Sequence, residues 1–315
     1  MSPILKMTFG RLALALPMLF AVATATFFLQ QLVPGDPGSF ILGKDATQAE
    51  IRQFDASLGV NRPVLAQYSS WLGRAIRGDL GTSWTSHAPV TQTLLAAAPV
   101  TLSLAVLVMI VIVPLAVVLG TAAALNRGPA DRLLQAIAGF AIALPNFWIG
   151  TGLVLLLAVD LRVFPATGYT GLSDPAQWLR SLALPVAALA IGPMMGLALQ
   201  VRGAMIDVLS KDYIRSLRAA GLPPRSVLFK HALRNAMPPV ITTIGFQLLG
   251  LLAGAVVIEQ LFNLPGIGTV LVTSVSAHDV PLVQGAVLLF AVVVVAVNLL
   301  TDIAAAVANP RARGR

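Results

Sequence analysis

Six long stretches without a single charged residue limit the folds that this chain can adopt. They cover residues 12–35, 80–126, 133–159, 181–201, 235–258 and 280–301. Each holds the roughly 20 mostly apolar residues that a helix needs to cross a bilayer. Charged residues make up only 11% of the chain, whereas a soluble domain has about 25%. The sequence therefore predicts an all-α membrane protein with six transmembrane helices.

The net charge of +8 fits a membrane topology better than a nucleic-acid-binding face. With both termini in the cytoplasm, fourteen of the twenty-one basic residues lie inside, as the positive-inside rule predicts. They are Lys6, Arg11, Arg127, Arg132, Arg202, six residues of the connector 207–235, Arg311, Arg313 and Arg315. No basic face with interleaved aromatic residues is present, so we expect no nucleic-acid partner. We expect a multi-pass protein of the bacterial cytoplasmic membrane, surrounded by lipid, with both termini inside.

The first apolar stretch is predicted to stay in the protein as a transmembrane helix. Lys6 and Arg11 precede it, as basic residues do in a signal peptide. Its apolar character, however, continues to Val33, well beyond a signal core of about 7–15 residues.

The segment that follows this first helix predicts short helices outside the membrane. Thr47 and Glu50 have the spacing of a capping box, and Gly59 can end the helix that they begin. Pro63 suits the first turn of a second helix, which Gly78 follows. The apolar side of that helix is Val64, Tyr68, Trp71, Leu72 and Ala75. Two interpretations remain open: a scaffold that covers helix ends, or a surface that receives an extracytoplasmic partner.

The connector between the fourth and fifth stretches is strongly basic and amphipathic in both of its halves. Its first half places Leu209, Tyr213, Leu217 and Ala220 on one apolar stripe. After a Gly-Leu-Pro-Pro turn that starts at Gly221, the pattern returns in Val227, Leu228, His231 and Ala232. A loop that only joined two helices would not need these features. We interpret the connector as a docking surface for a cytoplasmic partner.

The sequence offers no support for catalysis or nucleotide binding by this chain. Residues 38–45 have phosphate-loop spacing, but Asp45 replaces the Ser or Thr that holds magnesium and no strand precedes them. His87, His231 and His278 lie far apart in the sequence and lack metal partners at suitable spacing. The chain contains no cysteine. We therefore expect no enzyme activity and no bound cofactor or metal.

Proline, glycine and a few polar residues interrupt the apolar stretches. Pro114, Pro145, Pro185, Pro193, Pro238 and Pro239 are expected to kink or end helices. Two pairs, Gly192 with Gly196 and Gly250 with Gly254, have the spacing of closely packed helices. Glu259 and Asn298 are candidates for a transport path or gate, because polar groups within membrane helices are often functional. The alternative to a role in the path is that Glu259 lies at the outer interface of the membrane.

The chain resembles, from end to end, the permeases of dipeptide, oligopeptide and nickel ABC importers. The resemblance is carried by Pro-Gly-Asp-Pro at 34–37, Arg-Gly-Asp-Leu-Gly at 77–81, Leu-Pro-Asn-Phe-Trp at 144–148, Asp-Tyr-Ile-Arg at 212–215, Arg-Ala-Ala-Gly-Leu at 218–222, His-Ala-Leu-Arg-Asn-Ala at 231–236, Pro239, Pro-Gly-Ile-Gly at 265–268, Val-Gln-Gly at 283–285 and Asn-Pro-Arg at 309–311. Each segment is weak evidence alone, but their occurrence together and in order is highly specific.

The resemblance implies a type I ABC importer permease fold that forms half of a translocation path. It implies a first span with an outside helical segment at 1–98 and a five-helix core at 99–315, whose cytoplasmic coupling loop is 207–236. The implied partners are a homologous second permease, two ATPase subunits or domains that use ATP and magnesium, and an extracytoplasmic substrate-binding protein. The residues implied to meet an ATPase are Tyr213, Arg215, Arg218, Ala219, Ala220, Gly221, Leu222, His231 and Asn235.

The coupling motif departs from that of importer permeases in general. Such motifs begin Glu-Ala-Ala and have a glycine four residues after the second alanine. Here the glycine is Gly221, while Arg215, Ser216 and Leu217 occupy the first three positions. The resemblance is therefore to the peptide-transporter variant, in which Arg215 would meet an acidic group of the partner.

The transported molecule and two rival functions remain open at this level. Short peptides are our first expectation for the cargo, with nickel chelates or glutathione-like peptides as alternatives. A secondary transporter or channel would favour intramembrane charges and inverted repeats, and neither is evident. A membrane anchor for a signalling complex is the third class, against which the kinked helices argue weakly.

Overall fold

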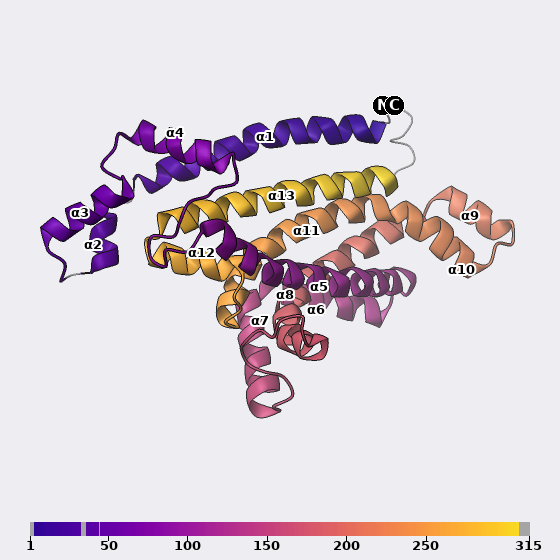
Figure 1. Ribbon diagram of the computed structural model, residues 1–315. Helices are drawn as coiled ribbons and strands as arrows, with labels where there is room; N and C mark the ends of the chain where they lie inside the picture. The colour runs from indigo at the N-terminus through magenta and orange to yellow at the C-terminus, as the bar shows by residue number, and fades with distance from the viewer. Residues whose placement is uncertain (1–2, 33–35, 44, 309–315) are drawn as a thin grey trace. The chain divides into compact units, whose positions relative to one another are not determined.

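The computed structural model describes residues 3–32, 36–43 and 45–308 (Figure 1). Among these residues every regular element is a helix, apart from one bridge between Thr82 and Pro89. The all-α class is thereby confirmed. Several residues named above lie outside the described residues, namely Val33, Pro34, Gly35, Lys44, Asn309, Pro310, Arg311, Arg313 and Arg315.

Five helices of the described residues are long and apolar enough to cross a membrane. They are α1 (Pro3–Gln30), α5 (Val90–Leu125), α8 (Pro175–Leu209), a continuous helix Pro224–Leu261 that ends in α11 (Arg234–Leu261), and α13 (Val280–Ala308). With 36 residues, α5 is about 54 Å long and exceeds a hydrocarbon core of about 30 Å. The number of spans is six when a broken pair of helices is taken as one span.

That broken pair occupies the third apolar stretch. The helix α6 (Pro129–Ala143) ends at Leu144, and α7 (Asn146–Leu153) with its π-helical continuation η1 (Val154–Asp160) leaves at an angle of 99°. Leu144 has an extended backbone with ψ 129°, which is the conformation that a following proline imposes. The third apolar stretch is therefore two helices joined at a sharp break, and the prediction that Pro145 kinks or ends a helix is confirmed.

The other prolines are accommodated inside helices. Pro185 and Pro193 lie within α8, and Pro238 and Pro239 lie within α11. Pro114 likewise falls inside α5. Neighbouring helices and local adjustments can satisfy the backbone groups that a proline leaves free. Of the six prolines, Pro145 therefore ends a helix as expected, and the other five lie within helices. Kinks at those five positions stay a prediction.

The chain divides into two compact units. The first unit comprises Met1–Phe9, Leu102–Leu264 and Ala296–Arg315. The second comprises Gly10–Thr101 and Pro265–Val295. The division of the sequence at residues 98 and 99 into an N-terminal part and a permease core stays a prediction.

In the second unit, three short helices follow α1 and two of them follow the sequence prediction closely. In α3 (Gln48–Leu58), the Thr47 hydroxyl accepts from the Glu50 N–H at 3.3 Å, and the Glu50 carboxylate accepts from the Thr47 N–H at 2.8 Å. The hydrogen bond from the Thr47 N–H is the main cause of a lowered pKa of Glu50. A second hydrogen bond, from the Thr47 hydroxyl, lowers this pKa further. Gly59 ends the helix in the left-handed region with φ 73°. The capping box and the glycine stop are confirmed.

The next helix, α4 (Val64–Ala75), packs its predicted apolar side against α1. The rings of Tyr68 and Trp71 lie 5.2 and 5.7 Å from the ring of Phe27, measured between centroids. The hydroxyls of Tyr68 and Thr24 are hydrogen-bonded at 2.7 Å. Val64 was predicted on the same side but is 39% exposed. An aromatic cluster thus fastens α4 to α1.

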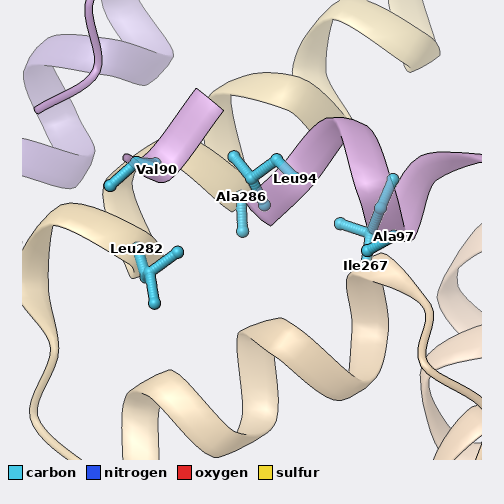
Figure 2. Close-up of a cluster of buried hydrophobic side chains, with 6 residues drawn as sticks. All are labelled: Val90, Leu94, Ala97, Ile267, Leu282 and Ala286. Atoms are coloured by element: carbon cyan, nitrogen blue, oxygen red, sulfur yellow. The ribbon is translucent and has the colours of Figure 1, made fainter. Parts of the chain in front are cut away.

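The core of the second unit joins the start of α5 to the start of α13 (Figure 2). Its buried members are Val90, Leu94, Ala97, Ile267, Leu282 and Ala286. A short apolar helix that the sequence analysis did not predict, α12 (Ile267–Ser276), contributes Ile267. A Cβ at Gly285 would lie 2.5 Å from Cγ1 of Val90, which explains why a glycine stands at this position of α13.

A buried carboxylate also holds the loop before α5. Asp279 is fully buried at the start of α13 and accepts hydrogen bonds from the backbone N–H groups of Trp84 and Thr85, both at 3.2 Å. Its Oδ2 further accepts from the hydroxyls of Ser83 and Thr85. Its Oδ1 accepts from the N–H of Leu282 at 3.4 Å, so the same side chain also caps α13. The buried charge is therefore well provided with donors.

The first unit is built on α8, which packs against α6, α7 and α11. Glycines allow this packing: a Cβ at Gly192 would lie 3.3 Å from the carbonyl oxygen of Ala141, and one at Gly254 would lie 3.3 Å from Nδ2 of Asn146. Asn146 is the first residue of α7, so its amide lies against α11 just beyond the helix break. This agrees with the close-packing interpretation of these two glycines.

Two further glycines in this unit differ sharply in their surroundings. A Cβ at Gly120 of α5 would lie 2.4 Å from the carbonyl oxygen of Ala198 on α8, so the two helices touch through their backbones. A Cβ at Gly250 of α11 would have nothing within 4 Å. Close packing within the chain therefore does not account for Gly250, although it belongs to a small-residue pair.

Candidate functional site

The connector begins where α8 ends at Leu209 and consists of two differently built halves (Figure 1). The first half is the short helix α9 (Asp212–Ala219). The second half is a turn of helix, α10 (Pro224–Ser226), and a π-helical segment, η2 (Val227–Leu233), which runs without interruption into α11. Only the first half is thus a separate short helix. The two amphipathic halves of the sequence thus differ in structure, since the second belongs to a long continuous helix.

The apolar stripe of the first half differs from the predicted one. Ile214 is the residue of α9 that is completely buried, whereas Tyr213 is 38% exposed and Ala220 is also exposed. The prediction assumed one continuous helical period from Leu209. Instead, Ser210 and Lys211 separate α8 from α9, and this break changes the phase of the helix.

The residues predicted to meet an ATPase are mostly at the surface of the chain. The exposed ones are Tyr213, Arg215, Arg218, Ala219, Ala220, Gly221 and Asn235, and the half-buried ones are Leu222 and His231. Ile214 anchors α9 from its opposite side. The connector therefore presents a continuous exposed segment around a fixed buried residue.

The turn at Gly221 has the geometry that ends helices with a left-handed residue. Gly221 has φ 79°, its N–H donates to the carbonyl of Arg218 at 3.0 Å, and the N–H of Leu222 donates to the carbonyl of Leu217 at 3.2 Å. These two bonds form a Schellman motif. The predicted helix-ending conformation is confirmed. A Cβ at Gly221 would meet nothing within 4 Å, so the requirement for glycine in the isolated chain comes from its backbone conformation.

The second half packs as its sequence pattern predicted. Val227 and Ala232 are buried, and Leu228 and His231 are half-buried. The amide of Asn235 donates to the carbonyl of His231 at 2.7 Å. A π-helical turn leaves backbone groups with irregular partners, and such turns are frequent at functional sites. Here the turn lies where the connector becomes the membrane helix α11.

The charge of the connector is almost entirely at its surface. All six basic residues are exposed, namely Lys211, Arg215, Arg218, Arg225, Lys230 and Arg234. The guanidinium of Arg215 lies 3.3 Å from the carboxylate of Asp212, and both side chains are largely exposed. An exposed ion pair of this kind contributes about 0–1 kcal/mol, so Arg215 can exchange it for another partner at little cost.

The two candidates for a path or gate lie in unlike surroundings. Glu259, near the end of α11, is fully buried within the chain. Its backbone carbonyl accepts from the N–H of Leu264 at 2.8 Å. Asn298 is exposed on α13. The role of both residues in a path, and the alternative that Glu259 lies at the outer membrane interface, stay predictions.

One partly buried ion pair near the connector was missed by the sequence analysis. The guanidinium of Arg202 on α8 binds both carboxylate oxygens of Asp131 on α6, and its Nη2 lies 2.6 Å from Oδ2. Asp131 is 5% exposed. The partners are 71 residues apart in the sequence, so no local spacing could have revealed them. The signal available was a charged residue, Arg202, two turns inside the end of a long apolar helix.

The second unit contains a cavity of about 640 Å³ beside α3 and α4. Its lining includes Gln30, Arg62, Gln67, Arg74, Trp84 and Gln284. The amide of Gln67 donates to the carbonyls of Val60 and Arg62, both at 2.8 Å, and so fixes the turn between α3 and α4. Whether these helices serve as a scaffold or receive an outside partner stays a prediction.

Comparison with protein families gives two matches that together cover nearly the whole chain. Residues 112–314 match the family described as the inner membrane component of binding-protein-dependent transport systems. Residues 4–105 match the N-terminal part of the membrane component of such systems. The connector and both members of the Asp131–Arg202 pair fall inside the first match.

Curated relatives are similar over their full length. A permease named for a peptide transport system in Brucella abortus is 39% identical over 96% of this chain and 97% of the relative. The oligopeptide transport system permease AppB of Bacillus subtilis is 35% identical over 96% of this chain and 97% of its own. The dipeptide transport system permease DppB of Escherichia coli is 35% identical over 98% and 99%.

Proposed function

Because this chain belongs to the family of inner membrane components of binding-protein-dependent transport systems, we propose that it is a permease subunit of an ATP-driven importer of short peptides. It forms half of the translocation path in a multi-pass membrane protein. The connector 207–236 attaches it to ATPase subunits in the cytoplasm. Energy enters through those subunits, and this chain converts their movement into a change of the path.

The exposure of the connector is the observation that carries this proposal. Six of the seven consecutive residues 215–221 are exposed, and Leu217 is half-buried. They end in a Schellman turn, in which the N–H groups of Gly221 and Leu222 donate to carbonyls of α9. A surface segment this regular, with buried Ile214 fixing its other side, is ready to bind without further folding. Its basic side chains favour an acidic cleft on the ATPase.

The connector is also placed to pass movement on to the membrane helices. Only Ser210 and Lys211 separate α9 from α8. On its other side, α10 and η2 continue directly into α11. A displacement of α9 by an ATPase therefore acts on the ends of α8 and α11 together. These two helices pack against each other, so they can move as one body while the path changes its open side.

Short peptides are the cargo that the relatives favour. The similar permeases from Bacillus subtilis and Escherichia coli are named for oligopeptide and dipeptide transport. A di/tripeptide permease from Pseudomonas aeruginosa is 36% identical over 96% of this chain and 97% of its own. Nickel chelates and glutathione-like peptides remain second candidates from the sequence resemblance. The relatives described above are all named for peptide transport, and none of their names refers to nickel or glutathione.

The assembly and its orientation belong to the same proposal. We place two ATPase subunits inside, a homologous second permease beside this chain, and a substrate-binding protein outside. ATP and magnesium act in the ATPase subunits. Within the segment 38–45, which has phosphate-loop spacing, residues 38–42 lie in the helix α2 (Pro37–Leu42) and not in a loop after a strand. The distribution of basic residues supports both termini and the connector in the cytoplasm.

Reconstitution of the complete transporter tests the proposal. The chain is purified with its neighbouring permease and ATPase subunits, placed in vesicles and supplied with the binding protein and a labelled dipeptide. We expect ATP-dependent uptake of the dipeptide. Uptake without ATPase subunits would instead identify a secondary transporter. Uptake of a nickel chelate but not of the dipeptide would show that the proposed cargo is wrong.

A further inference from the structure

The Asp131–Arg202 pair is one of the few charged contacts between two membrane helices among the described residues. Asp131 lies in the first turn of α6, where a negative charge is favoured by the helix dipole. Its Oδ2 also accepts from Nε2 of Gln135 at 3.2 Å. The contact from Arg202 is bidentate, through Nε and Nη2. Such paired geometry fixes orientation as well as distance.

A second contact shows how α6 and α8 run along each other. A Cβ at Gly192 would lie 3.3 Å from the carbonyl oxygen of Ala141. Ten residues separate Asp131 from Ala141 on α6, and ten separate Gly192 from Arg202 on α8. The two helices are therefore antiparallel and touch at both ends of a segment of about 15 Å. The ion pair closes one end and the glycine contact closes the other.

The pair lies on the route from the connector into the membrane. Arg202 precedes the end of α8 by seven residues, or about two helical turns. Any movement of the connector that displaces this end of α8 must move Arg202 as well. Asp131 can be left behind only if its buried carboxylate loses its partly buried guanidinium partner, which is strongly unfavourable.

We propose that Asp131 and Arg202 are positioning residues that make α6 follow α8 when the connector moves. The inference rests on the proposed coupling function of the connector and adds a third helix to the moving body. Through α6 the movement reaches the break at Pro145, where α7 turns away. The exposed ion pair of Arg215 with Asp212 cannot serve this purpose, because both of its members are on α9.

The direct test measures the distance between α6 and α8 during the ATP cycle. The chain contains no cysteine, so the substitutions Ala136→Cys and Asp207→Cys provide single sites for spin labels. Both residues are exposed, one on each helix. In the complete transporter with cysteine-free partner subunits, we expect the same label distance with and without ATP. With Asp131→Asn added, we expect ATP to shift the distance by about 1–2 Å or to broaden its distribution. A changing distance in the parent, or a constant distance with Asp131→Asn, overturns the proposal.

Transport efficiency provides an independent readout that loss of stability alone would not produce. Asp131→Asn and Arg202→Gln should each lower the peptide imported per ATP hydrolysed by about fivefold or more, at normal ATPase attachment. The double exchange Asp131→Arg with Arg202→Asp should recover most of that loss. Arg132→Gln removes an exposed charge next to Asp131 and should leave the ratio unchanged. Unchanged ratios in the single variants, or no recovery in the double exchange, contradict the assignment.

These outcomes are separable from a failure of the proposed function. If the unmodified transporter hydrolyses ATP without importing any peptide, the proposed cargo is wrong. The distances between the spin labels still test whether the ion pair holds α6 to α8. If ATP leaves the distance constant even with Asp131→Asn, the pair does not hold α6 to α8, whatever the cargo.

Discussion

The Oδ2 atom of Asp279, at the start of α13, accepts a hydrogen bond from the hydroxyl of Ser83, 196 residues earlier in the chain. Both side chains are buried. The bond belongs to a set of donors that tie the loop 82–89 to the start of α13. The loop that leads into the long helix α5 is thus fixed by one carboxylate.

Replacement of that carboxylate should loosen the loop. Asp279→Asn keeps the shape of the side chain but turns an acceptor oxygen into a donor facing the donors of Ser83 and Thr85. Unsatisfied buried groups cost about 1–3 kcal/mol each, so we expect a lower unfolding midpoint in detergent and faster proteolysis within 82–89. Asp160→Asn, at an exposed position, serves as the control. Equal midpoints for the two variants would refute this role of Asp279.

Backbone contact between α5 and α8 makes a second prediction. Gly120→Ala places a Cβ 2.4 Å from the carbonyl oxygen of Ala198 and should force the helices apart. Such overpacking costs about 1–3 kcal/mol. Gly250→Ala meets nothing within 4 Å and should gain up to about 1 kcal/mol of helix propensity. Thermal unfolding of the two purified chains compares them directly, and a destabilisation by Gly250→Ala as large as that by Gly120→Ala would contradict the packing described.

Local sequence predicted those features whose causes are local. Thr47 and Glu50 form their capping box because both partners lie within one helical turn. Gly221 ends α9 because a left-handed residue and a following Pro-Pro pair cannot continue a helix. The long apolar stretches likewise predicted the helices that can span the membrane, since bilayer thickness sets the minimum length of such a helix.

Features that depend on distant packing were not predictable in this way. Pro145 ends α6, yet Pro185 and Pro193 remain inside α8. Next to Pro145, the Asn146 side chain lies against positions occupied by Gly192 and Gly254 on two other helices, and no local pattern reveals such a contact. The apolar stripe of α9 was predicted at the wrong residues, because a break of two residues before Asp212 shifts the helical phase.

The orientation of the chain can be tested by labelling from outside intact cells. Single cysteines are introduced by Ser57→Cys, Ser173→Cys, Ser276→Cys and Ser216→Cys, all at exposed positions. The topology predicts that the first three react with an impermeant maleimide and that the fourth reacts only after the membrane is opened. Reaction of Ser216→Cys in intact cells, or failure of Ser57→Cys, would contradict the topology.

The basic side chains of the connector should give a modest, salt-dependent contribution to ATPase attachment. Arg218 is exposed, and an exposed charge contact is worth about 0–1 kcal/mol. Arg218→Glu should therefore weaken attachment by less than about tenfold, and the difference from the parent should shrink at high salt. Co-purification at two salt concentrations measures this effect. A complete loss that high salt does not reduce would show that Arg218 is buried in the interface.

The most direct test of the connector's coupling role compares two substitutions of Gly221. Asn tolerates the left-handed backbone that Gly221 adopts at φ 79°, whereas Glu pays about 1–2 kcal/mol for it and adds a negative charge to a basic surface. With the chain at normal abundance in the membrane, we expect Gly221→Asn to retain most ATPase attachment and dipeptide uptake, and Gly221→Glu to lose both. Normal uptake by Gly221→Glu would remove the connector from the coupling mechanism.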